Sequence, residues 1–255
     1  SEDRVKGYRN FLNKLWNANN FLIMNKCAFK NTKKLPKLTI NINKWIYAEL
    51  LEVKNTVEQN LKDYRFDEAS RNAYQFVWHS YCDWYVELSK TILNSKNQKD
   101  IKEVRIVSSY IFKQILILMH PFIPFITEEI WLKNKLDNSK KNFLMLANWP
   151  KGKSKKDKNF KEVKKMINII SEIRSFKNEL NVKPGSFIDI SVEKINNKSF
   201  FKENDIILKR LGRINNFFTQ DQNKPGATLV ISGDLFRIYF DQTVDLNLIK
   251  ENLLK

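Results

Sequence analysis

Residues 64–90, YRFDEASRNAYQFVWHSYCDWYVELSK, decide the fold of this chain. One helical segment there carries six aromatic residues: Tyr74, Phe76, Trp78, Tyr81, Trp84 and Tyr85. A core stripe recurs at helical spacing along the same segment: Ala69, Ala73, Val77, Tyr81, Trp84 and Leu88. Asp67 stands where it can cap the first turn. Because the rings surround the helix, we expect a bundle of helices to bury most of them.

Residues 8–22 predict a helix with two distinct faces. At about 100° per residue, one arc is apolar: Tyr8, Phe11, Leu12, Leu15, Ala18 and Leu22. The opposite arc is rich in amides, with Lys14 just beside it: Arg9, Asn10, Asn13, Asn17 and Asn20. Trp16 falls at the border of this polar arc, and the pattern fits a buried ring and a surface ring equally well.

Three further helical patterns complete the first 136 residues. The first has the core stripe Trp45, Ile46, Leu50, Val53, Val57 and Leu61. The second has the core stripe Ile101, Val104, Ser108, Ile111, Ile115 and Leu118. The third is short and carries Thr127, Glu128, Ile130 and Trp131. The second of these helices should end near His120, because Pro121 and Pro124 lack backbone donors and favour extended geometry before them. Long amphipathic helices joined by polar loops predict a bundle.

The second part of the chain predicts a small α/β module. Residues 151–165 contain eight lysines, which is typical of a linker running into a helix. That helix carries Val163, Met166, Ile167, Ile170, Ile173 and Leu180 and should end at Pro184-Gly185. A strand with alternating Ile188, Ile190 and Val192 follows, and then a helix with Phe201, Ile207, Leu208 and Leu211.

Two turns are predicted in this module. Gly212 should close its helix in the left-handed conformation, which glycine adopts cheaply. Ser232-Gly233-Asp234 should form a tight hairpin through its Gly-Asp pair. The predicted class is therefore mainly α: a helical bundle at 1–150, a small α/β module at 151–242, and the start of a helical arm at 243–255.

The net charge of +17 and the pI near 9.7 indicate an anionic partner, since Lys and Arg that neutralise phosphates release counterions on binding. Lysines that merely solvate helix faces would give the same excess. Cys27 and Cys82 lack the spacing of a zinc site or a disulfide framework. We expect a reduced, cytosolic protein without metal ligands or a membrane span, since no apolar run approaches about 20 residues.

Few side chains in this sequence are spaced for a catalytic role. His79 and His120 lack partners at metal or general-base spacing, so we expect structural roles. Asp83 and Glu87 are four residues apart, and surface ion pairing accounts for them better than acid–base work. Basic charge, amides and aromatic rings together favour a single-stranded RNA binder. The candidate RNA-binding residues are Arg9, Asn10, Asn13, Lys14, Trp16, Asn17 and Asn20.

Several motifs carry a resemblance to one family. They are GYRNF with NKLWNA (residues 7–18), YRFDEA (64–69), YCDWYVELSK (81–90) and HPFIPFITEEIW (120–131). With these motifs the chain resembles the anticodon-binding region of valyl-tRNA synthetases. One departure is Asn20-Phe21, where the family usually has Arg-Phe, so one expected cation is absent from the predicted RNA face.

The resemblance implies a tRNA-recognition fragment of an enzyme that joins valine to its tRNA through a valyl-adenylate, using ATP and magnesium. Its bundle would bind the anticodon arm, and its α/β module would support the tRNA body. The ATP-binding signatures and the editing domain of the family are not found here, so those parts would belong to the rest of the same polypeptide. We expect this chain alone neither to activate valine nor to charge tRNA.

Two alternatives stay open. One is the corresponding region of an isoleucyl-tRNA synthetase, although Cys82-Asp83-Trp84-Tyr85 favours the valyl enzymes. The other is a basic helical scaffold that binds protein partners or any nucleic acid without reading sequence.

Overall fold

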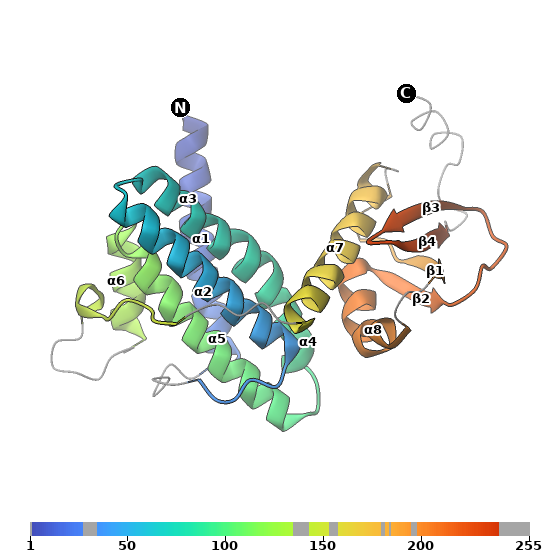
Figure 1. Cartoon of the computed structure of the whole chain (residues 1–255), viewed down its shortest axis with the longest axis horizontal. Helices are drawn as coiled ribbons and strands as arrows, with labels where there is room; N and C mark the ends of the chain where they lie inside the picture. The colour runs from blue at the N-terminus through green and yellow to red at the C-terminus, as the bar shows by residue number, and fades with distance from the viewer. Residues whose placement is uncertain are drawn as a thin grey trace. The chain divides into compact units, whose positions relative to one another are not determined.

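The computed structural model describes residues 2–27, 35–134, 143–152, 158–179, 182–183, 185–194 and 198–239. The chain divides into two compact units, Ser1–Phe160 and Lys161–Lys255. The first unit is helical and the second contains a four-stranded sheet (Figure 1). This confirms the predicted class, mainly α with a helical bundle followed by a small α/β module. The predicted helical arm at 243–255 lies outside the described residues.

Four long helices form the bundle of the first unit. They are α1 (Glu2–Met24), α2 (Asn41–Lys62), the continuous run of α3 (Phe66–Gln75), η1 (Phe76–Tyr85) and α4 (Val86–Leu93), and α5 (Gln98–Met119). The shorter α6 (Pro124–Lys133) and the 3-10 turn η2 (Leu144–Leu146) follow. Helix α5 is central, because it contacts α1, α2, α3, α4 and α6. Its predicted stripe is buried throughout, as Val104, Ile111 and Ile115 illustrate.

Two local predictions in the bundle are wrong. Tyr8, predicted in the core, is 65% exposed, because the first turns of α1 extend past the neighbouring helices and burial begins only at Phe11 (Figure 1). Asp67 does not cap α3, since the N-cap residue is Arg65 and makes no side-chain cap. Asp67 lies instead inside the first turn, where a carboxylate is stabilised by the helix dipole.

The aromatic segment is a π-helix, η1, between two α-helices. Buried positions along η1 and into the first residue of α4 come in pairs at 76/77, 81/82 and 85/86, so the first step is five residues long. Phe76, Tyr81 and Tyr85 are buried, and the last two rings stack with centroids 5.7 Å apart. The other three aromatic side chains are half-buried: Tyr74, Trp78 and Trp84. Three rings of this segment therefore point into the core, and three lie at its border.

A buried polar network fixes η1 to its neighbours. The Tyr85 hydroxyl donates to Asn43 Oδ1 over 2.8 Å, and Asn43 Nδ2 donates to Glu103 over 2.9 Å. The Glu103 carboxylate also accepts the backbone N–H groups of Thr39 and Ile40 at 3.1 Å. Because each buried polar group has a partner, this network ties η1, α5 and the start of α2 into one arrangement.

The end of α5 follows the prediction. The helix finishes at Met119, and α6 begins with Pro124 in its first turn. His120 Nδ1 lies 2.9 Å from Thr127 Oγ1, across the bend between the two helices. His120 thus joins the two helices, which fits the structural role expected for it.

The second unit is a four-stranded sheet with two helices. Its elements are α7 (Lys158–Glu179), β1 (Ile188–Lys194), α8 (Lys198–Gly212), β2 (Ile214–Phe218), β3 (Gly226–Ile231) and β4 (Asp234–Tyr239). The strand order is β2-β1-β4-β3, with β1 parallel to β2 and the other two pairs antiparallel. Both helices lie on the same side of the sheet (Figure 1). The predicted alternation holds in β1, where Ile188, Ile190 and Val192 are buried.

Both predicted turns differ in detail. Gly212 is not in the left-handed region; Arg213 adopts it instead, with φ of 56°. A Cβ at 212 would lie 2.9 Å from Ile214 Cδ1, the end of a flexible side chain that can move aside, so the contact at 212 is close but does not require glycine. In the hairpin, the turn residues are Ser232 and Gly233, with φ of 53° and 82°, and Asp234 already begins β4. Positive φ at both positions matches the type I′ turns that suit the twist of paired strands.

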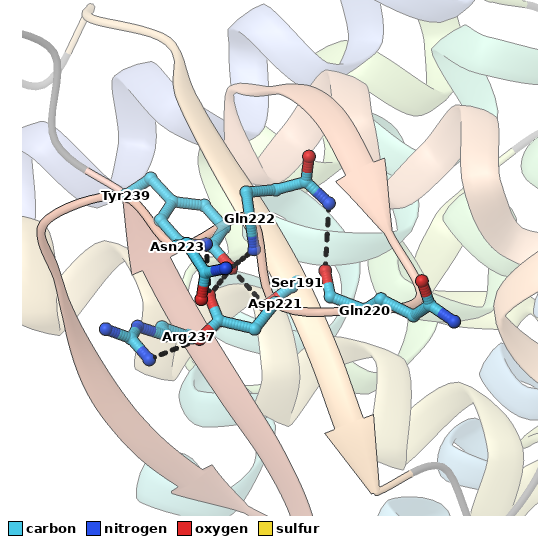
Figure 2. A network of polar contacts seen from close by, with 7 residues as sticks. All are labelled: Ser191, Gln220, Asp221, Gln222, Asn223, Arg237 and Tyr239. Atoms are coloured by element: carbon cyan, nitrogen blue, oxygen red, sulfur yellow. Dashed lines mark hydrogen bonds and ion pairs between the residues drawn. The ribbon is translucent and has the colours of Figure 1, made fainter.

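The loop before β3 is fastened to the other face of the sheet by Tyr239 (Figure 2). The Tyr239 hydroxyl donates to Asp221 Oδ1 over 2.7 Å, lies 2.8 Å from Ser191 Oγ, and accepts the Gln222 N–H over 2.8 Å. Arg237 completes the network with an ion pair of 2.6 Å to Asp221. The hydrogen bond from Tyr239 is the main reason why the pKa of Asp221 is lowered.

Candidate nucleic-acid interface

The polar arc of α1 forms a continuous exposed strip. We call it the amide face, and it consists of Arg9, Asn10, Asn13, Asn17 and Asn20, all exposed. At 1.5 Å per residue it runs about 16 Å along the helix. The opposite arc is anchored by Leu15 and Leu22, which are fully buried. The apolar residues of α1 therefore hold the amides toward solvent, and all five candidate residues of the arc lie on one surface.

Lys14 flanks the amide face on the side of η1. Its ammonium nitrogen lies 3.8 Å from the centroid of the Trp78 ring, and it forms an ion pair with Asp83. The Trp78 ring also stacks on the Tyr74 ring, with centroids 5.8 Å apart. The centroid of the Phe11 ring lies 4.6 Å from that of Tyr74. An aromatic ledge of the half-buried Tyr74 and Trp78, packed on the buried Phe11, thus borders the amide face.

Trp16 flanks the amide face on the side of α6. Its half-buried ring lies under the Lys133 ammonium, 4.8 Å from nitrogen to centroid. Beside it, Asn134 Nδ2 donates to the buried Asn19 over 2.7 Å. The amide face is therefore bounded on both sides by an indole ring with a lysine over it, Lys14 on Trp78 and Lys133 on Trp16.

The acidic and histidine side chains near this surface are used in ion pairs. Asp83 joins Lys14 and also lies 3.2 Å from His79 Nδ1, and Glu87 lies 2.5 Å from Lys90 Nζ. The expected role of Asp83 and Glu87 as ion-pair partners matches these contacts.

The two cysteines have no reactive character. Cys27 and Cys82 are both free and buried, and burial raises the pKa of each thiol to about 12. A thiol held protonated in this way is a packing group rather than a nucleophile. Within the described ranges, no group of three metal-ligating side chains occurs. In that same part of the chain, none of the helices has the length and apolar character needed to cross a bilayer.

Three contributors to this surface were missed by sequence reasoning. Trp78 and Tyr74 were expected in the core, but both are half-buried and lie at its border. For Trp78 the sequence signal is the five-residue step from Phe76-Val77 to Tyr81-Cys82, within which it falls. Nothing in the sequence indicated the position of Lys133, since its place over Trp16 depends on how α6 packs against α1.

The helical bundle belongs to a known class. Residues 43–192 match the family model described as the anticodon-binding domain of tRNA ligase. This match covers more than half of the sequence, and the chain belongs to that family. The matched residues run from α2 to β1, so the amide face of α1 lies outside the match, closer to the N-terminus.

The most informative relatives are valine–tRNA ligases. The chain is 69% identical to that of Pelagibacter ubique over 255 residues, which covers 99% of the chain and 29% of the relative. It is 36% identical to that of Zymomonas mobilis, covering 100% of the chain and 29% of the relative, and 32% identical to that of Brucella suis, covering 91% and 26%. The predicted resemblance to valyl-tRNA synthetases is confirmed. The chain spans less than a third of the length of these relatives.

Proposed function

We propose that this chain is the tRNA-recognition module of a valine–tRNA ligase and binds the anticodon arm of valine tRNA. The observation that carries the proposal is the amide face, five exposed polar side chains on one helix between two lysine–indole pairs. Membership of the anticodon-binding family and 69% identity to a valine–tRNA ligase support the same reading.

Each part of the surface has a role in the proposed complex. Asparagine amides at 13, 17 and 20 both donate and accept, so they can pair with the edges of unstacked bases. Trp16 and the aromatic ledge offer rings for stacking at the two sides of the strip. Arg9 and Lys14 supply positive charge for the RNA backbone.

Lys14 is a special case in this proposal. Its ion pair with Asp83 partly neutralises it, so an RNA phosphate would have to compete with that carboxylate. The pair is partly exposed, and ion pairs of that kind contribute only about 0–1 kcal/mol. Exchange of Asp83 for a phosphate at Lys14 is therefore a low-cost step.

The reaction of the whole enzyme is part of the proposal as well. A longer polypeptide of this kind would join valine to its tRNA in the cytoplasm through a valyl-adenylate, using ATP and magnesium. The rest of the polypeptide would supply the catalytic and editing domains. The segment described above would contribute tRNA binding and no bond-making residue.

The test compares two RNA stem-loops that differ only in the three anticodon bases, one with the valine anticodon. Binding is measured by fluorescence anisotropy at several salt concentrations. We expect at least tenfold tighter binding of the valine stem-loop, a difference of about 1.4 kcal/mol, maintained as salt rises. Equal affinities with a steep salt dependence would instead identify a scaffold that binds any RNA.

A further inference from the structure

A cluster of cations lies in the second unit, where α7 ends and β1 begins. Lys177 on α7 is only 3% exposed, and its Nζ donates to the Ser186 carbonyl over 2.5 Å. Arg174, one turn earlier, donates from Nε to the Leu211 carbonyl over 3.0 Å. The Arg213 guanidinium lies over the Phe187 ring, 5.6 Å from its centroid. Three positive side chains from two separate parts of the sequence thus meet at one end of this unit.

Two of these cations, Lys177 and Arg213, have no carboxylate partner among the described residues. Burial lowers the pKa of Lys177, and the neighbouring charges of Arg213 and Arg174 lower it further. The nearby Asp189 accepts from the backbone N–H and the side chain of Asn216 at 3.1 and 3.0 Å. An ammonium that is buried against a carbonyl and beside like charges is stabilised when an anion arrives.

Arg213 and Phe187 are positioned by the backbone at the start of β1. Arg213 has φ of 56° and its carbonyl accepts the Ile188 N–H over 3.0 Å, which ties it to the start of β1. Phe187 directly precedes that anchor and is 56% exposed. Arg213 is exposed as well. The guanidinium and the ring are therefore presented together to solvent, with Lys177 behind them.

We propose that Arg213 and Phe187, with Lys177 behind them, form a second RNA-binding site that takes one phosphodiester group and its adjoining nucleoside. The guanidinium would hold the phosphate oxygens in a bidentate fashion, and the base would stack on the exposed side of Phe187. Neither group discriminates between base edges, so the site adds affinity without reading the anticodon. This inference extends the proposed function, and it does not depend on anticodon recognition by the amide face.

The experiment uses a fluorescein-labelled single-stranded oligouridine that has no anticodon. Its affinity for the unchanged chain is compared with that for Arg213→Gln, Phe187→Ala and the matched control Lys202→Gln. Lys202 is an exposed residue of α8, and its replacement removes the same charge away from the cluster. Circular dichroism checks that each variant is folded.

We expect Arg213→Gln to weaken binding and to reduce the slope of log K against log salt by about 0.7, the value for one phosphate contact on a single strand. Phe187→Ala should weaken binding about fivefold or more without changing the slope, because it removes stacking and no charge. Lys202→Gln should leave the affinity within about twofold, a smaller loss than one stacking contact contributes. Equal losses for Arg213→Gln and Lys202→Gln, or no effect of Phe187→Ala, would overturn the site.

A second measurement needs no variant. In the chain with isotope-labelled lysines, saturating oligouridine should raise the pKa of Lys177, because a bound phosphate favours its charged form. An unchanged Lys177 pKa would also contradict the proposal. Since the probe has no anticodon, these results are independent of the stem-loop comparison, and either proposal can fail while the other stands.

Discussion

The ammonium nitrogen of Lys14 lies 3.8 Å from the centre of the Trp78 indole ring, while the same lysine is ion-paired with Asp83. A cation that the sequence assigned to RNA contact is thus also a link between α1 and η1. Its two partners differ in what they do to an incoming anion. The ring leaves the charge available, whereas the carboxylate competes with phosphate for it.

Replacing Asp83 should therefore separate stability from RNA binding. We expect Asp83→Asn to lower the free energy of unfolding by up to about 1 kcal/mol, as for a partly exposed ion pair, and to tighten binding of any RNA at low salt. Urea unfolding and anisotropy measure the two effects. The control is Glu87→Gln, which removes the same charge one turn later but releases Lys90. If both variants tighten binding equally, Lys14 has no special part in it.

The amide face should carry the discrimination between anticodons. Asn13→Ala or Asn17→Ala is expected to reduce the preference for the valine stem-loop by about 1–3 kcal/mol, by analogy with bidentate contacts to DNA bases. Lys14→Ala should instead weaken all stem-loops alike and flatten the salt dependence. Asn215→Ala, at an exposed asparagine of β2, is the control and should have no effect. A uniform loss for both asparagine variants would show that the face does not read sequence.

Glu103 should make stability depend on acid pH. Burial disfavours its charged form, but hydrogen bonds from Asn43, Thr39 and Ile40 outweigh burial and lower its pKa. A lowered pKa stabilises the fold above the unfolded value of about 4.3, and this contribution disappears as the pH falls through the lower folded value.

The variant Glu103→Gln tests this dependence by urea unfolding at pH 7 and near pH 3. It should be about 1–3 kcal/mol less stable at pH 7, and the difference from the unchanged chain should shrink at the lower pH. Glu129→Gln, at an exposed position of α6, is the control and should be neutral at both. A difference that stays constant with pH would contradict the assignment.

Two glycines should respond oppositely to alanine. A Cβ at Gly226 would lie 2.5 Å from the carbonyl oxygen of Ile238, so Gly226→Ala should cost about 1–3 kcal/mol by forcing β3 away from β4. Gly7 lies within α1 and has open space around its Cα, so Gly7→Ala should be neutral or stabilise by up to about 1 kcal/mol. Thermal unfolding compares them, and a neutral Gly226→Ala would show that the strands separate easily.

The Tyr239 hydroxyl should hold the loop before β3 in place. Tyr239→Phe leaves the Gln222 N–H and Asp221 without their shared partner, which should cost about 1–3 kcal/mol. Hydrogen exchange should then become faster at Gln222. Tyr8→Phe, at an exposed tyrosine of α1, is the control. Unchanged exchange at Gln222 would mean that the loop is held by other contacts.

Much of the fold could be predicted because periodic burial is a local property of the sequence. The stripe of α5 and the alternation of β1 both follow from spacing alone. The predictions that were wrong concern residues whose burial or conformation depends on contacts with other parts of the fold. Tyr8 has the right spacing for the core, but no other helix reaches it. Gly212 has the expected place in the sequence, but the left-handed conformation falls one residue later, at Arg213.

The candidate site was predictable to the same extent. The amide face is a property of one helix, so its arc could be drawn from the sequence. Its borders depend on contacts between helices, and the pairing of Lys133 with Trp16 has no local signal. The arrangement of Lys177, Phe187 and Arg213 was harder still to predict from the sequence. These residues come from an α-helix, a loop and a turn that meet only after the sheet has formed.

The π-helix places a limit on changes in the length of this chain. If η1 kept its wide π-helical turns, deleting one residue within it would rotate everything beyond the deletion by about a quarter of a turn relative to what precedes it. Either Tyr81 and Tyr85 would then leave the core, or Trp78 would leave Lys14. The number of residues in this one helix is therefore set jointly by its buried side and by the side that places Trp78 beside Lys14, and a change that suits one side would disturb the other.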